Sequence, residues 1–129
     1  MAETNSQENN INTTVTVLER YAAGKRDFAG VNLGKADLQG VDLKGCDLSY
    51  ADLSEANLNG ANLRGCDLSF ANLTQADLQN ADLRGALLFA ADLRQANLTG
   101  TKLAKADCDR NTHFPDNFDL FSVGLRIQD

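Results

Sequence analysis

The sequence lacks several features on which common functions and locations depend. No apolar run approaches the roughly 18 residues that a membrane-spanning helix needs, so no membrane association is expected. The first ten residues, MAETNSQENN, contain neither a basic region nor an apolar stretch, and we expect no signal peptide there. The chain has 129 residues, which is enough for one domain with a core. These features together predict a cytoplasmic protein.

Positive charge is also in short supply. The chain has 12 Lys and Arg residues against 18 Asp and Glu residues, a formal net charge of -6. This excess of acidic groups argues against direct binding to nucleic acid or to an anionic membrane. A basic partner, or mimicry of an acidic one, stays open.

Cysteine and histidine are too few and too scattered for a metal or redox centre. Cys46, Cys66 and Cys108 are odd in number and form no Cys-x-x-Cys motif, so reduced thiols are expected. The one histidine, His113, lies outside the repeats described below, which leaves a zinc site or a catalytic triad unsupported. There is no Gly-rich phosphate loop. We therefore predict no enzyme activity, no cofactor and no metal.

The chain does have a five-residue repeat, which occupies most of its length. The central residue is Phe28 and then Leu at every fifth position from Leu33 to Leu103. A small residue precedes it by two places, and Asp or Asn lies between them except at Leu87 and Lys102. A period of five would spread the leucines around a helix and alternate them between the faces of a strand, so neither element fits. The repeat predicts a solenoid that turns a corner every five residues, with Leu and the small residue inside.

The last position of each five-residue unit is often Gly, which suits a tight turn. Tyr50, Phe70 and Lys105 also occupy it. Because side chains disfavour a positive φ, we expect that left-handed backbone is not obligatory at this position. The Asp and Asn residues suit repeated turns, since their side chains can bind nearby backbone amides.

A longer recurrence indicates how many units form one coil. The segments GCDLSY (45–50) and GCDLSF (65–70) are nearly identical and lie 20 residues apart. Nothing comparable recurs at 15 or 25 residues. If four units close a coil, these two segments stack directly on each other.

The A(D/N)LXX pattern of residues 27–107 resembles the pentapeptide-repeat family, in particular its short cyanobacterial members. The resemblance implies an all-β fold, a right-handed quadrilateral parallel β-helix with about four coils over residues 26–108. Some members of this family mimic DNA and bind DNA gyrase. A DNA-mimicking inhibitor or protector of gyrase is therefore the alternative function.

Both ends of a solenoid need caps, because its last core layers and strand edges are otherwise open. Residues 13–25 are expected to form a helical cap with Thr13 or Thr14 as N-cap, although the β-branched run at 15–17 also allows a strand. Residues 1–12 are polar and expected to be disordered.

The C-terminal tail, residues 109–129, does not follow the five-residue repeat. We expect it to cap the upper core layer or, alternatively, to form a dimerisation surface. The residues expected to cover that layer, around Leu93, Leu98 and Leu103, are Phe114, Phe118, Leu120 and Phe121.

The 20-residue register predicts an apolar stripe on the outside of the solenoid. Tyr50 and Phe70 lie one above the other, followed by Leu87 and Phe89. Contiguous exposed apolar patches usually mark contact sites. Cover by the chain's own tail, self-association and docking of another protein are the three interpretations that stay open.

The same register stacks Lys44, Arg64 and Arg84 into a basic column. This column either neutralises Asp42 and Asp82 locally or forms a contact strip for an acidic partner. The function predicted from the sequence is a non-catalytic structural or protein-interaction module. It would present rigid β-helix faces to an unknown protein partner, as a monomer or weak homodimer.

Overall fold

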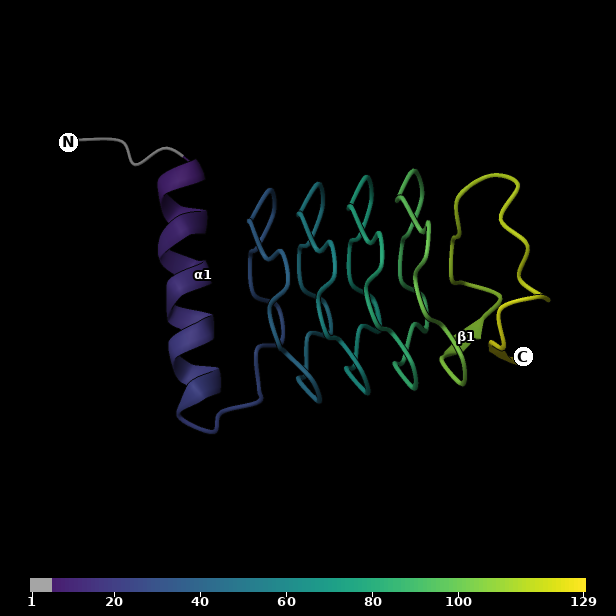
Figure 1. Ribbon diagram of the computed structural model, residues 1–129, viewed down its shortest axis with the longest axis horizontal. Coiled ribbons are helices and arrows are strands. Elements are labelled where there is room, and N and C mark those ends of the chain that lie inside the picture. The colour runs from purple at the N-terminus through teal and green to yellow at the C-terminus, as the bar shows by residue number, and fades with distance from the viewer. Residues whose placement is uncertain (1–5) are drawn as a thin grey trace.

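The computed structural model describes residues 6–129, with the backbone alone for residues 6–12. Helix α1 (Ser6–Ala22) lies across one end of a stack of coils, and the short parallel strands β1 (Asp107–Asp109) and β2 (Arg126–Gln128) lie at the other end (Figure 1). Parallel bridges link residues 20 apart along the stack, for example Asp37 with Asn57 and Asn57 with Asp77. Four units therefore form one coil, as the recurring hexapeptide predicts.

Each corner of a coil is a type II β-turn. The Ala36 N–H donates to the Leu33 carbonyl at 3.1 Å, and Lys35, the third residue of that turn, has a φ of 60°. A type II turn requires positive φ at its third residue, which is the last position of the repeat unit. Where that position is not Gly, it is still left-handed: Lys35, Tyr50, Glu55, Phe70, Gln75, Asn80, Ala90, Gln95 and Lys105. The expectation that left-handed backbone is not obligatory is therefore wrong.

The repeat also satisfies its own backbone hydrogen bonds. The second residue of a unit accepts, through its side chain, the N–H two positions later, as Asp37 Oδ1 does from Gln39 at 3.2 Å. All five N–H groups of the unit 56–60 have acceptors, which are in chain order the carbonyls of Leu53, Ala36 and Asp77, the side chain of Asn57, and the carbonyl of Gln79. Because buried backbone groups must be paired, this complete accounting explains why Asp or Asn recurs.

The core is a column of leucines with small residues beside them. Leu33 to Leu93 are fully buried at every fifth position, and the small residues two places before most of them are buried as well. Burial of a leucine side chain contributes roughly 1.5–3 kcal/mol relative to leaving it exposed. The predicted inward positions are confirmed.

Helix α1 packs against the first coil. Val17 is 2% exposed and shares a hydrophobic cluster with Phe28, and the Tyr21 hydroxyl donates to the Lys44 carbonyl at 2.9 Å. The helix begins at Ser6, so Thr13 and Thr14 lie within it rather than before it. Residues 6–12, expected to be disordered, are helical, and the strand alternative for 15–17 is wrong. The expected disorder of residues 1–5 lies outside the described residues.

The C-terminal tail lies against the last coil. Phe114 and Phe118 stack with their ring centroids 5.3 Å apart and pack against the core, as predicted. Leu120 and Phe121 do not join this contact, and Phe121 is 86% exposed, so the prediction is wrong for these two. Val123 and Leu125 are the other tail residues that pack against the core.

Candidate functional site

Tyr50 and Phe70 form an exposed stacked pair on one corner of the solenoid. Their ring centroids are 4.8 Å apart with an interplanar angle of 2°, and the residues are 66% and 54% exposed. The stack follows from the 20-residue register, because both residues end the same unit of successive coils. The tail does not cover these rings, so of the three interpretations self-association and docking of another protein stay open.

The backbone at this pair has the left-handed conformation, which large side chains disfavour. Tyr50 and Phe70 have φ values of 61° and 62°, whereas Gly30 occupies the same position in the coil before them. A bulky residue with positive φ is an outlier that costs on the order of 1 kcal/mol. The two rings are thus held at positions where glycine would suit the fold better.

The rest of the predicted stripe lies to one side of the pair. Ala90, not Phe89, follows Phe70 at the next corner, and the Phe70 N–H donates to the Phe89 carbonyl at 2.8 Å. Leu87 bridges Asp67 one column further along. Leu87 and Phe89 are both half-buried. Phe89 lies beside the column of stacked rings, because it occupies the fourth position of its unit while the two rings occupy the fifth.

Leu87 also removes a hydrogen bond that the repeat normally makes. Asp67 Oδ1 accepts the Ser69 N–H at 2.9 Å, but Leu87 has no such oxygen for the N–H of Phe89. Within residues 6–129, that N–H has no acceptor. Leu87 therefore replaces a residue that stabilises the turn with an apolar side chain on the outer face.

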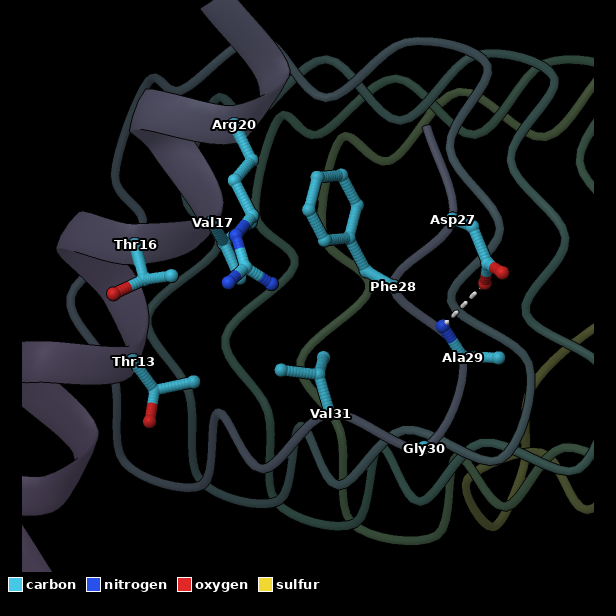
Figure 2. Close-up of a pocket in the computed structure, with 9 residues that line it drawn as sticks. All are labelled: Thr13, Thr16, Val17, Arg20, Asp27, Phe28, Ala29, Gly30 and Val31. Atoms are coloured by element: carbon cyan, nitrogen blue, oxygen red, sulfur yellow. Dashed lines mark hydrogen bonds between the residues drawn. The ribbon is translucent and has the colours of Figure 1, made fainter. Parts of the chain in front are cut away.

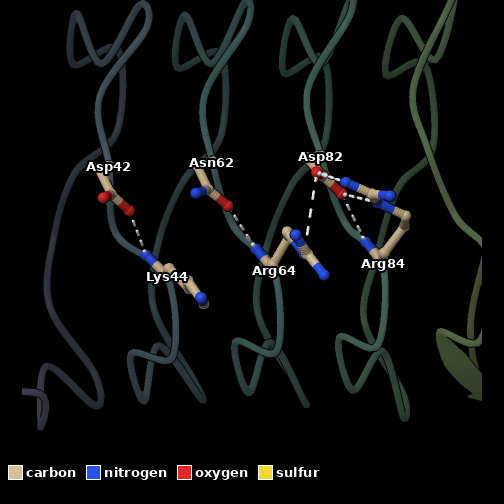
Figure 3. Close-up of polar contacts among 6 residues, drawn as sticks. All are labelled: Asp42, Lys44, Asn62, Arg64, Asp82 and Arg84. Atoms are coloured by element: carbon tan, nitrogen blue, oxygen red, sulfur yellow. Dashed lines mark hydrogen bonds and ion pairs between the residues drawn. The ribbon is translucent and has the colours of Figure 1, made fainter.

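The basic column lies at the other corner of the same side of the coil, and Figure 3 shows its members along three successive coils. Arg84 binds Asp82 through two hydrogen bonds of 2.9 and 2.7 Å, and Arg64 Nε lies 4.0 Å from Asp82. The Arg84 hydrogen bond is the largest effect that lowers the pKa of Asp82 below its usual range. Arg84 therefore neutralises Asp82, as the local interpretation predicts.

Lys44 differs from the two arginines in this column. Its backbone N–H donates to Asp42 Oδ1 at 3.0 Å, but its ammonium group forms no ion pair with any described carboxylate. Local neutralisation therefore does not extend to Asp42. Lys44, and Arg64 in part, are the members of the column whose charge is available to a partner.

A glycine follows each member of the basic column in the same turn. A Cβ built on Gly45, Gly65 or Gly85 would meet no atom within 4 Å. The result is one side of the solenoid with cations at one edge and two aromatic rings at the other, and with Asp27, Asp47 and Asp67 bridged in a column between them.

The cysteines belong to the core. Cys46 and Cys66 are buried and unpaired by disulfides, and the Cys66 thiol donates to the Leu43 carbonyl at 3.0 Å. Burial raises the pKa of Cys46 to about 11 and that of Cys66 to about 12. Their thiolates are therefore unavailable as nucleophiles near neutral pH. In the described part of the chain, no group of three or more His, Cys, Asp or Glu side chains is placed to hold a metal ion.

A hollow that the sequence did not predict lies between α1 and the first coil (Figure 2). It has a volume of about 390 Å³ and contains one cation, Arg20, and one carboxylate, Asp27 (Figure 2). Asp27 Oδ1 accepts the Ala29 N–H at 3.2 Å, as in other units. The remaining lining residues are Thr13, Thr16, Val17, Phe28, Gly30 and Val31. The hollow depends on how α1 crosses the coil, for which the sequence has no periodic signal.

The repeat geometry matches a known family. The family model of pentapeptide repeats matches eight copies, over residues 27–65, 51–88, 66–104 and 91–110. The chain belongs to the pentapeptide-repeat family. The family's fold is the right-handed quadrilateral β-helix, which agrees with the coils described above.

Two solved structures of pentapeptide-repeat proteins are similar to this chain. The protein alr5209 from Nostoc PCC 7120 is 70% identical over 88% of this chain and 94% of its own chain, with a TM-score of 0.88. A pentapeptide repeat protein from the Arabidopsis thaliana thylakoid lumen is 31% identical over 64% of this chain and 61% of its own, with a TM-score of 0.54.

The more distant similarities do not indicate a function for this pentapeptide-repeat protein. QnrB1, a plasmid-mediated fluoroquinolone resistance protein, matches at 16% identity over 80% of this chain and 79% of its own, with a TM-score of 0.40. Such a likeness supports no functional inference. No curated protein matches the chain significantly. Among the described residues, no helix has the length and apolar character needed to cross a membrane.

Proposed function

We propose that this pentapeptide-repeat protein is a non-catalytic interaction module that presents a rigid β-helix face to a protein partner. The observation that carries the proposal is the stacked pair of Tyr50 and Phe70. Two large rings are exposed and held in one geometry, at positions where the backbone favours glycine. Residues retained against the needs of the fold point to a role outside it.

The rigidity of the face favours binding. Because backbone hydrogen bonds fix the coils on both sides, the rings lose little freedom when a partner covers them. Aromatic side chains and arginine are also the residues that most often dominate binding energy at protein interfaces. A partner that suits this face has an apolar patch for the two rings and acidic residues for Lys44 and Arg64.

The proposal is tested by comparing captured proteins from a cyanobacterial lysate for the wild type and for Tyr50→Gly/Phe70→Gly. Glycine is preferred at both positions, so the fold is expected to be kept. Glu55→Gly is the matched control, since Glu55 is another left-handed corner residue and lies in a different column from both the rings and the basic residues. We expect the double variant to lose a partner that the wild type and the control both retain. Equal captured sets for all three proteins would contradict the proposal.

We place the protein in the cytoplasm, as a monomer or weak homodimer. The three buried thiols without disulfides support the location, and the small size of the exposed aromatic pair supports the oligomeric state. Light scattering across a range of protein concentrations tests the oligomeric state, and a fluorescent fusion tests the location. A stable dimer that buries Tyr50 and Phe70 would make self-association the function of this face.

A DNA-mimicking role on gyrase is the alternative, and most of this surface does not favour it. In three of the four columns carboxylates alternate with amides, as at Asp52 and Asn72 or at Asn62 and Asp82, whereas Asp27, Asp47 and Asp67 form one uninterrupted acidic row that ends at Leu87. Arg84 further neutralises Asp82. An effect of the protein on gyrase supercoiling at micromolar concentration would reverse this assessment.

A further inference from the structure

The backbone edge of a coil carries a fixed set of hydrogen-bonding groups on each of its sides. On the side that contains Ala76, three bonds join one coil to the next. The Asn97 N–H donates to the Ala76 carbonyl at 2.9 Å, the Leu78 N–H donates to the Asn97 carbonyl at 2.9 Å, and the Asn80 N–H donates to the Thr99 carbonyl at 3.0 Å.

The same side one coil higher carries the equivalent three groups without partners. Within residues 6–129, nothing donates to the Ala96 carbonyl, and nothing accepts from the N–H of Leu98 or of Gly100. The tail does pair on both flanks. The His113 carbonyl accepts from Leu93 at 2.7 Å, and the Gly124 carbonyl accepts from Lys105 at 2.8 Å. On the last coil, the unpaired edge therefore lies between Leu93 and Lys105, the stretch that the tail bypasses.

A groove lies over this stretch. It has a volume of about 500 Å³ and is lined by residues 95–99 of the coil and 115–118 of the tail. Leu98 is half-buried here, whereas the repeat leucines from Leu33 to Leu93 are fully buried. The groove thus offers both unpaired backbone groups and an incompletely covered apolar side chain.

We infer that this groove binds an extended peptide segment of another protein, which adds one parallel strand to the coil edge. The unpaired groups define what the segment must supply. One residue donates its N–H to the Ala96 carbonyl and accepts the Leu98 N–H with its own carbonyl. The carbonyl two residues later accepts the Gly100 N–H.

The repeat itself shows which sequence meets these requirements. The three groups that serve Ala76, Leu78 and Asn80 come from the Asn and Thr of the unit ANLTG (96–100). A segment with a small residue, then Asx, Leu, any residue and Gly therefore fits the groove. Proline at the Asx position is excluded, because it has no N–H for the Ala96 carbonyl.

The inference is tested with the intact ¹⁵N-labelled protein and the peptide acetyl-RGANLTGAD-amide. We expect the amide signals of Leu98 and Gly100 to shift on titration and their hydrogen exchange to slow. Leu78 and Asn80, which are already paired within the protein, serve as internal controls and should stay unchanged.

Two methylated peptides distinguish backbone pairing from non-specific contact while leaving the protein unaltered. N-methylation of the peptide Asn removes the N–H that meets Ala96 and should weaken binding roughly tenfold, the effect of losing one hydrogen bond. N-methylation of the peptide Leu, whose N–H points away from the edge, should weaken it far less.

Four results would overturn the inference. The first three are unchanged Leu98 and Gly100 signals at millimolar peptide, equal weakening by both methylated peptides, and concentration-dependent protection of the two amides without peptide, which would identify a second copy of the chain as the occupant. Shifts near Tyr50 and Phe70 alone would also overturn it and leave the proposed function standing.

Discussion

At the level of single residues, the fifth position of the repeat carries the strongest backbone constraint in the chain. Every unit from the one that ends at Gly30 to the one that ends at Lys105 has positive φ there, although nine of the residues are not glycine. The coil-to-coil hydrogen bonds impose this conformation on whichever residue is present. The strain at Tyr50 and Phe70 is therefore a property of their position and not of local sequence preference.

This constraint predicts opposite effects for two matched substitutions. Glu55→Gly should raise the free energy of unfolding by about 1 kcal/mol, because glycine adopts the left-handed conformation without steric cost. Gly60→Ala should lower it by a similar amount, since a Cβ there would meet no atom within 4 Å and φ alone opposes it. Urea denaturation measures both. A destabilised Glu55→Gly protein would show that the corner does not strain side chains.

At Leu87, the contribution of the side-chain acceptor at the second position of the unit can be measured. Leu87→Asn supplies an acceptor for the Phe89 N–H and should raise the free energy of unfolding by about 0.5–1.5 kcal/mol relative to Leu87→Ala. The alanine variant is the control for loss of the leucine side chain itself. If both variants have the same stability, the side-chain acceptor at this position contributes nothing to the fold.

The sequence allowed the inward and outward positions to be predicted residue by residue, but not the conformation of the corner. Leu33 and its equivalents repeat without exception, so burial was evident from the period alone. The prediction that positive φ is not obligatory at the fifth position rested on Tyr50 and Phe70, because large residues seldom adopt positive φ. Stacking of the coils overrides that preference, and no short-range pattern reports it.

At the level of elements, the two ends of the solenoid are held in different ways. Helix α1 uses buried contacts of Val17 and the Tyr21 hydroxyl bond, whereas the tail pairs β2 with β1 and adds an ion pair. Arg126 binds Asp107 through two hydrogen bonds of 2.9 Å each. The tail end is thus the one that depends on charge.

This difference predicts a pH dependence at the C-terminal end. The Arg126 hydrogen bonds hold the pKa of Asp107 below its usual range. Stability from the pair is therefore complete above the unfolded pKa of about 3.9 and is lost as the pH falls through the lower folded pKa. The protection factor of the Arg126 amide, which donates to Ala106, should fall on acidification toward pH 2.

The control for this prediction is Asp107→Asn, in which the same position cannot titrate. Its Arg126 protection should be lower at neutral pH and should change less between pH 7 and pH 2. An identical acid profile in the wild type and the variant would show that other carboxylates control the β1–β2 contact.

Element boundaries were harder to predict than the repeat. Residues 6–12, SQENNIN, have no apolar periodicity, so the first turns of α1 could not be predicted from them. In the tail, Phe114 and Phe118 were predicted to cover the core, but Val123 and Leu125 were not, because the path of a non-repeating segment is set by packing. The unpaired edge at Leu98 follows from that path and has no signal in the sequence.

At the level of the whole molecule, the repeat makes the protein a rigid stack in which each coil contacts mainly its neighbours. Such a stack fixes the spacing of side chains on its faces, and the register was predictable because GCDLS recurs at 45–49 and 65–69. The face at Tyr50 and Phe70 was predicted on that basis. The structure was needed to show that Arg84 pairs with Asp82 whereas Lys44 forms no ion pair with any described carboxylate.

The central claim is that residues that depart from the repeat on this face serve binding and not folding. The most direct test is the free energy of unfolding of the variant Tyr50→Gly/Phe70→Gly/Leu87→Asn, which restores the repeat at all three positions. Loss of the ring stack costs about 0.5–1.5 kcal/mol, which the relief of strain at two corners and the new acceptor offset. We predict that this variant unfolds with a free energy no lower than that of the wild type. A decrease of more than about 1 kcal/mol would contradict the claim, because the three side chains would then be part of what holds the fold together.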